Sequence, residues 1–260
     1  MNRKEYMCAL LKWYVAAGIS EATDTEPRDR FQATPLRKAV VASAPAAKPL
    51  ESPATAREKS RDTVEIAAAC TTLAELRATI HAFDGCALKR TATNTVVGNG
   101  DEDAALMVIG EAPGAEEDRQ GLPFVGPAGQ LLNRMLASIN LKRQTVYVSN
   151  ILPWRPPGNR SPTAEEIALC QPFIERQIAL VGPRVLILVG GISAKSLLNE
   201  KQGITRLRGT WRELTVANLA DPVATMATFH PAYLLRQPAA KREAWRDLLA
   251  VQKKLQTPNA

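Results

Sequence analysis

The stretch Ala-Leu-Met-Val-Ile-Gly-Glu-Ala-Pro-Gly, residues 105–114, joins a short apolar run to a turn that contains two glycines. Three further apolar runs follow, at Val146–Leu152, Val185–Gly190 and Ala224–Phe229. Helical spacing of apolar residues occurs between or after these runs, at Gly129–Ile139, Ala164–Leu180, Ser193–Leu198 and Lys241–Leu255. Short apolar runs bounded by turn residues are typical of buried strands. Their alternation with helical segments predicts an α/β domain with a mostly parallel sheet.

Polar or glycine-rich residues follow the end of each predicted strand. These ends are residues 110–114, Asn150 with the loop at 154–160, residues 190–193, and His230 with Pro231. Loops are generally polar, so any one of these ends has a purely structural explanation. Because open α/β sheets bind ligands at the carboxyl ends of their strands, the four ends together predict a functional site at that edge.

The residues at this edge restrict the chemistry of the site. The Gly-Glu-Ala-Pro-Gly turn is neither GxGxxG nor a Walker A loop, which disfavours nucleoside triphosphate chemistry. Glu116, Glu117 and Asp118 follow it and are expected to form a solvated acidic helix start. Phe124, in a loop with glycines at both ends, is either a core residue or a stacking platform for a planar base.

Cationic and donor groups accompany these residues. Arg155 and Arg160 lie in a stiff Pro-rich loop and give it phosphate-binding capacity. Gly191 and Ser193 open a helix whose N-terminus is a natural phosphate site. Of the two histidines, His81 falls in a helical pattern, whereas His230 follows a buried strand and is the candidate catalytic group.

The N-terminal part of the chain differs in composition from the rest. Residues 1–19 predict a short amphipathic helix, with Tyr6, Leu10 and Trp13 at helical spacing. Residues 20–61 are rich in Pro, Ala, Ser and Thr and predict a disordered linker, so the folded domain is expected at 62–260. The helix can dock on this domain or on a partner protein, and the sequence leaves both possibilities open.

Charge and cysteine usage narrow the class of protein. The net charge is +7, and residues 195–254 contain eleven Lys or Arg against five Asp or Glu. This excess is expected of a nucleic-acid surface, although solvated helix faces explain it equally well. Four widely spaced cysteines favour a reducing compartment, and no apolar run approaches the length of a membrane span. The start of the chain also makes a poor secretory signal, so we expect a cytoplasmic protein with no membrane contact.

From about Phe83 to Leu249 the chain resembles the family 4 uracil-DNA glycosylases. The resemblance rests on three ordered blocks: GEAPGAEEDRQGLPFVGPAGQLL at residues 110–132, Asn150 with RPPGNRSPT at 155–163, and HPAYLLR at 230–236. It implies a three-layer α/β/α fold with a short, mostly parallel, four-stranded central sheet. It also implies base excision repair, in which uracil is flipped out of DNA and its N-glycosidic bond is hydrolysed to leave an abasic site.

The resemblance assigns roles to residues of this chain. The implied catalytic residues are Glu111, Asn150 and His230. The implied substrate-binding residues are Gly110, Ala112, Pro113, Gly114, Glu117, Phe124 and Asn159. The implied DNA-binding residues are Arg155, Arg160, Gly191, Ser193, Tyr233, Leu234, Leu235 and Arg236.

Each principal role has a physical reason. Phe124 would stack on the flipped base, and Asn150 would read its Watson–Crick edge, because one amide can pair with both O4 and N3–H of uracil. His230 would face uracil O2 and donate a hydrogen bond as negative charge builds on the departing base. Glu111 lies in the motif that binds the water, and residues 233–236 would enter the minor groove and fill the gap that the base leaves.

One departure from the family pattern is large. That pattern holds an iron–sulfur cluster on four cysteines, which correspond here to positions 83, 86, 154 and 170. Only Cys86 and Cys170 remain, whereas Phe83 and Trp154 occupy the other two positions. Two thiolates cannot supply four-Cys ligation, so we expect no cluster, no other metal, and apolar packing in its place.

Two alternatives concern the reaction itself. Relatives that bond covalently to DNA carry a basic, histidine-containing insertion near the position of Arg206–Gly209, and none is visible here, which favours ordinary hydrolysis. The non-enzymatic alternative is a DNA-lesion-binding or DNA-polymerase-associated protein that retains the fold. Glu111, Asn150 and His230 are all present, which argues against it. We expect a monomeric enzyme whose partner is uracil-containing DNA.

Overall fold

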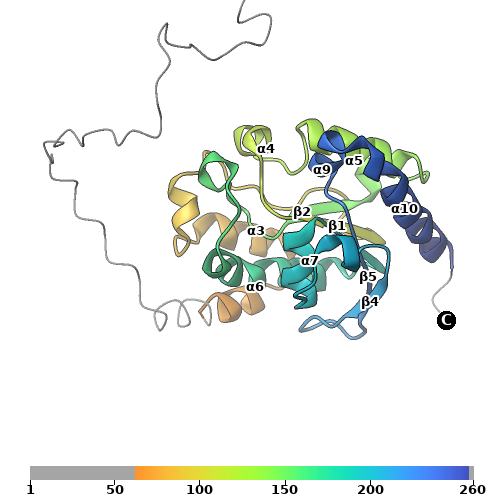
Figure 1. Cartoon of the computed structure of the whole chain (residues 1–260). Coiled ribbons are helices and arrows are strands. Elements are labelled where there is room, and N and C mark those ends of the chain that lie inside the picture. The colour runs from red at the N-terminus through yellow and green to blue at the C-terminus, as the bar shows by residue number, and fades with distance from the viewer. Residues whose placement is uncertain (1–61, 258–260) are drawn as a thin grey trace, which may run out of the picture. The chain divides into compact units, whose positions relative to one another are not determined.

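A computed structural model describes residues 62–257 of the chain (Figure 1). The predicted N-terminal helix at 1–19 and the predicted linker at 20–61 lie outside the described residues. Within the described part, no helix is both long and apolar enough to span a bilayer.

A five-stranded sheet forms the centre of the domain, with the strand order β2-β1-β3-β5-β4. The strands are β1 (Leu106–Gly110), β2 (Tyr147–Asn150), β3 (Val185–Val189), β4 (Trp211–Leu214) and β5 (Val223–Thr228). The pairs β1–β2, β1–β3 and β3–β5 are parallel, and β4 pairs antiparallel with β5. The four predicted strands and the mostly parallel sheet are confirmed.

The predicted number of strands is wrong by one. Strand β4 has the sequence Trp-Arg-Glu-Leu, and only its last residue, Leu214, is buried. A short edge strand of this kind carries charged residues and lacks the apolar run that marks the buried strands. It was therefore not recognisable by the signal that identified the other four.

Helices and short turns of 3-10 helix connect the strands. Residues 62–69 are helical, and the further α-helices are α3 (Leu73–Ala82), α4 (Ala115–Gln120), α5 (Pro127–Ala137), α6 (Ala164–Val181), α7 (Gly191–Leu198), α8 (Ile204–Leu207), α9 (Pro231–Arg236) and α10 (Lys241–Gln256). The 3-10 turns are η1 (Ala87–Arg90), η2 (Arg143–Thr145), η3 (Pro157–Asn159) and η4 (Pro238–Ala240).

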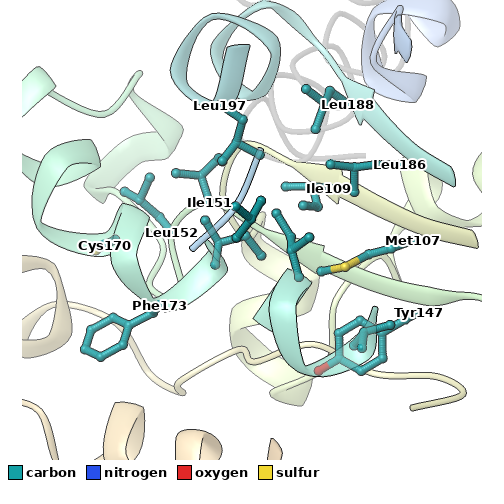
Figure 2. Close-up of a cluster of buried hydrophobic side chains, with 14 of the residues drawn as sticks. Met107, Ile109, Tyr147, Ile151, Leu152, Cys170, Phe173, Leu186, Leu188 and Leu197 are labelled. Carbon is teal, nitrogen blue, oxygen red and sulfur yellow. The ribbon is translucent and has the colours of Figure 1, made fainter. Parts of the chain in front are cut away.

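The two faces of the sheet bury two separate hydrophobic clusters. Along β1, Met107 and Ile109 belong to a cluster with residues of α3, α6 and α7. Figure 2 shows part of this cluster, including Phe173 of α6 and Leu197 of α7. Leu106 and Val108 face the other way, into a cluster with residues of α5, α9 and α10. Side chains alternate across a strand, so a strand that is buried along its whole length reads as a continuous apolar run. The two clusters confirm the three-layer α/β/α fold.

Candidate active site

A pocket of about 360 Å³ opens at the carboxyl ends of β1, β2, β3 and β5. Thirteen of the predicted residues line it: Glu111, Ala112, Pro113, Gly114, Glu117, Phe124, Asn150, Asn159, Arg160, Gly191, His230, Tyr233 and Arg236. Four further residues, to which no individual role was assigned, also line it: Ala128, Pro156, Gly190 and Ala232. Pro156 and Gly190 lie in the strand-end segments that predicted the site, whereas the two alanines carry no chemical signal of their own.

Asn150 is the last residue of β2 and lies beside Gly110, its register partner at the end of β1. The side chain is only 5% exposed, and its buried Oδ1 atom has no hydrogen-bond partner among residues 62–257. A buried acceptor without a donor costs roughly 1–3 kcal/mol, so such atoms point to a missing ligand donor. Gly110 does not line the pocket, but a Cβ at this position would collide with Oδ1.

Phe124 holds an unusual backbone conformation for an aromatic residue, with φ at 56°. Its carbonyl lies against Gly129 of α5, where any Cβ would collide with it. The ring packs over Gly110, and its centroid is 5.8 Å from that of the His230 ring at an interplanar angle of 31°. Phe124 is both a buried residue and part of the pocket wall. A positive φ is a strained backbone conformation for an aromatic residue, and such strain is typical of functional positions that the surrounding structure fixes.

Two carboxylates of α4 have structural partners. Glu117 Oε1 accepts a hydrogen bond from the backbone N–H of Gly126 at 2.9 Å, which ties the loop that carries Phe124 to α4. Asp118 was expected to be solvated, and that expectation is wrong. Asp118 is buried, and its Oδ1 accepts hydrogen bonds from the backbone N–H groups of Thr93 and Asn94 at 2.8 and 3.1 Å.

Glu111 follows β1 directly and lies in the pocket wall. Burial raises the pKa of its carboxyl group above the ordinary value of 4.5, because a charged carboxylate is poorly solvated in this position. Raised carboxyl pKa values in clefts are typical of functional sites.

His230 caps the N-terminus of α9. Its Nδ1 atom accepts a hydrogen bond from the backbone N–H of Ala232 at 3.1 Å, so the ring proton resides on Nε2. Burial, with a smaller contribution from the charge of Arg236, lowers the pKa of His230 from 6.5 to about 4. The imidazole is therefore neutral at pH 7 and has its Nε2–H free to donate into the pocket.

The residues predicted to contact DNA divide into exposed and buried groups. Tyr233 and Leu235 are exposed on α9, at 37% and 44%, and Arg236 is exposed beside them. Leu234 is only 1% exposed and packs in the cluster with α5 and α10, so the prediction that it reaches DNA is wrong.

A similar correction applies to α7. Ser193 is fully buried, and its hydroxyl donates to the carbonyls of Val189 and Gly190 at 2.9 and 3.2 Å. It has no surface to offer a phosphate, whereas Gly191 of the same turn does line the pocket. Which of Gly191 and Ser193 faces the pocket depends on how α7 is rotated about its axis against the sheet.

Both arginines of the Pro-rich loop have internal partners. Arg155 Nε donates to Asn159 Oδ1 at 2.7 Å, and its Nη1 lies 3.9 Å from Asp118 Oδ2. Arg160 forms a two-pronged pair with Glu166 of α6, at 2.9 and 2.6 Å. These contacts fix the loop over the pocket. The Arg160 side chain remains 44% exposed, so it can meet a phosphate while it is paired.

The four positions that correspond to cluster cysteines lie in one buried region. The rings of Phe83 and Trp154 stack at 6.3 Å, and Phe83 meets Phe173 edge to face at 5.2 Å. Trp154 is fully buried and its Nε1–H donates to Thr95 Oγ1 at 3.1 Å.

Two thiols complete this region. Cys86 and Cys170 are both buried, and the hydrogen bond between them raises the pKa of Cys170 and lowers that of Cys86. Two thiols and two aromatic rings do not provide the four thiolate ligands that an iron–sulfur cluster requires. Among residues 62–257, no group of three or more His, Cys, Asp or Glu side chains is placed to hold a metal ion.

The fold and the pocket together define an α/β protein with a cleft at the carboxyl edge of its mostly parallel sheet. Residues 97–249 match the model of the uracil DNA glycosylase superfamily, so the chain belongs to that superfamily. Type-4 uracil-DNA glycosylases from Archaeoglobus fulgidus, Pyrobaculum aerophilum and Thermotoga maritima are 42%, 39% and 40% identical to it. The alignments cover 62%, 68% and 58% of this chain, and 82%, 91% and 77% of those proteins. Within the superfamily, the chain is a member of the type-4 family.

Proposed function

We propose that the pocket receives a uracil flipped out of DNA and that the protein hydrolyses its N-glycosidic bond, leaving an abasic site. The protein is then a hydrolase of base excision repair. The observation that carries this proposal is the buried Oδ1 of Asn150, which lines the pocket and has no donor. Uracil N3–H is a donor of the kind that this atom lacks.

The same amide explains how normal DNA is excluded. Uracil presents N3–H as a donor and O4 as an acceptor, which match the oxygen and the NH₂ group of Asn150. Cytosine presents an acceptor at N3 and an amine at C4, so both positions are mismatched. A site built around buried polar groups rejects such a ligand strongly, because those groups are left unpaired.

Catalysis requires stabilisation of both fragments as the bond lengthens. Negative charge develops on uracil, and the Nε2–H of neutral His230 is the donor that meets it at O2. Positive charge develops on the sugar, and we assign Glu111 to holding the water that attacks C1′. The ring of Phe124 stacks on the base and keeps it in line for this attack.

DNA contact is assigned to the exposed residues around the pocket. Tyr233 and Leu235 would enter the duplex at the minor groove and occupy the space of the flipped base, while Arg236 meets a phosphate. Arg155 and Arg160, with the N-terminal turn of α7 at Gly191, form the opposite side of this contact. Their positions support this assignment, because Arg160, Gly191, Tyr233 and Arg236 line the pocket. Arg155 lies in the same loop as Arg160, and Leu235 lies on α9 beside Arg236.

We also propose that the protein works without an iron–sulfur cluster. The stacked rings of Phe83 and Trp154 support this, because they occupy two of the four ligand positions. Protein purified without oxygen should contain no stoichiometric iron or sulfide, and a brown chromophore would contradict the proposal. A cytoplasmic location and a monomeric state remain proposals, to be tested by cell fractionation and light scattering. A protein partner for residues 1–19 is also a proposal.

Asn150→Asp tests the proposed recognition directly. A suitably protonated carboxyl group can complement cytosine, so the variant should release cytosine while uracil release falls. Release of both bases from matched oligonucleotides is measured under single-turnover conditions. Asn140→Asp is the control for the same chemical change, because Asn140 is exposed and does not line the pocket. Unchanged uracil release with no cytosine release would show that another residue reads the base.

A further inference from the structure

A largely buried polar cluster includes Thr228, two residues before His230, and takes one residue from each of three segments. They are Arg208 after α8, Thr228 at the end of β5, and Asp247 on α10. Arg208 donates to both carboxylate oxygens of Asp247, from Nη2 at 2.6 Å and from Nε at 3.1 Å. The Thr228 hydroxyl donates to Asp247 Oδ2 at 2.6 Å. Asp247 and Thr228 are 3% and 1% exposed.

The guanidinium of Arg208 has three further contacts, one of which joins its Nη1 to Glu243 Oε2 at 3.9 Å. Its Nη2 donates to the carbonyl of Glu243 at 2.6 Å, and its Cζ lies 5.2 Å from the centre of the Phe229 ring. A planar guanidinium that forms a bidentate pair and also covers an aromatic ring is fixed in orientation. Arg208 therefore holds Phe229 against α10.

The Arg208–Asp247 ion pair therefore contacts the side chains of both residues that precede His230. Asp247 holds the side chain of Thr228, and Arg208 covers that of Phe229. The carbonyl of Thr228 also accepts the N–H of Gly190, a residue of the pocket wall, at 2.9 Å. The chain that leads into α9 is therefore held by Arg208 and Asp247, which do not line the pocket, and by the pocket-wall residue Gly190.

We infer that Arg208 and Asp247 are positioning residues for His230, holding its Nε2–H where the departing base develops charge. Neither residue lines the pocket, so they act through Thr228 and Phe229. This role rests on the proposed function of His230 as the donor to uracil O2. A displacement of the donor by about 1 Å is sufficient to slow a reaction as much as a hundredfold.

The inference differs from a purely structural role in what it predicts for rate and binding. In Arg208→Met the single-turnover rate of uracil release should fall by about tenfold or more. Affinity for an oligonucleotide that carries a non-cleavable 2′-fluoro-arabino uridine should change by less than about twofold. Thr228→Val removes one hydroxyl and leaves the Arg208–Asp247 pair intact, so its rate should fall by about threefold.

A matched control removes an ion pair elsewhere in the fold. Arg212 on β4 pairs with Glu200 at 2.7 Å, and Arg212→Met should leave the rate of uracil release unchanged. Folding of every variant is checked by circular dichroism. If Arg208→Met does not fold, Thr228→Val decides the matter, because its hydroxyl is the smallest part of the cluster.

NMR of the imidazole gives a readout that does not depend on activity. The chain has two histidines, so His81→Gln leaves His230 as the single source of imidazole signals. The Nε2–H tautomer should give one sharp set of signals in this background, and Thr228→Val or Arg208→Met should broaden or split it. Unchanged signals together with unchanged rates in folded variants would overturn the inference. Absence of uracil release by the parent chain would refute the proposed function instead, and the NMR result would remain interpretable.

Discussion

Trp154→Ala should destabilise the domain more than any other single aromatic truncation proposed for this chain. Trp154 is fully buried, stacks on Phe83, and donates to Thr95. Truncation of a buried tryptophan to alanine costs about 3–5 kcal/mol, which includes the cavity that remains. Thr95 is partly exposed and can turn to water, so the lost hydrogen bond adds little. We expect the free energy of unfolding to fall by about 4 kcal/mol.

The assay is urea unfolding followed by far-UV circular dichroism, with the midpoint and slope both fitted. Trp245→Ala is the matched control, because Trp245 is 40% exposed on α10 and should lose only about 1 kcal/mol. Trp154→Phe retains most of the ring volume and should fall between the two. A loss below about 1 kcal/mol for Trp154→Ala, or equal losses at both tryptophans, would refute the claim that apolar packing holds this region together.

Three further predictions concern the site. His230→Ala should slow single-turnover uracil release by on the order of a hundredfold or more, while DNA binding weakens much less. His81→Ala is the control. A near-normal rate in His230→Ala would show that His230 is not the donor. The logarithm of the DNA binding constant should fall linearly with the logarithm of salt concentration, and Arg236→Ala should make this slope shallower by about one. A flat plot would contradict the proposed phosphate contacts. Because folding lowers the pKa of His230 from 6.5 to about 4, the unfolded chain binds more protons between these pH values, and stability should decrease as the pH falls through that window. At pH 4 the free energy of unfolding should be lower by up to about 3 kcal/mol, and His230→Gln should lack this pH dependence. If the urea midpoints of the two proteins changed in parallel with pH, the prediction would be contradicted.

Local sequence signals accounted for most of the fold and for the place of the site. The four parallel strands are apolar runs bounded by glycine or proline. Apolar character and bounding turn residues are both visible within a few adjacent residues, so these strands could be predicted from the sequence. The residues at their ends were identified because parallel strands bring their carboxyl ends to one edge. Strand β4 lacked this signal, because an edge strand needs only one buried residue, Leu214.

The wrong predictions about site residues have a different origin. Leu234 and Leu235 are chemically alike, and only the phase of α9, set by its His230 cap and Pro231, buries one and exposes the other. The burial of Asp118 depends on backbone donors at Thr93 and Asn94, about 25 residues away. Contacts of such separation in the sequence leave no periodic trace, and the Arg208–Asp247 pair is a further example.

The central claim is that this pocket releases uracil from DNA by hydrolysis. The most direct test incubates the chain in excess with an oligonucleotide that contains a single uracil, and measures free base and abasic sites by mass spectrometry. We expect free uracil and abasic sites in equal amounts, with no protein–DNA adduct and no base released from a matched cytosine or thymine oligonucleotide. Tight binding of the uracil oligonucleotide without release of the base would contradict it and would identify a lesion-binding protein instead.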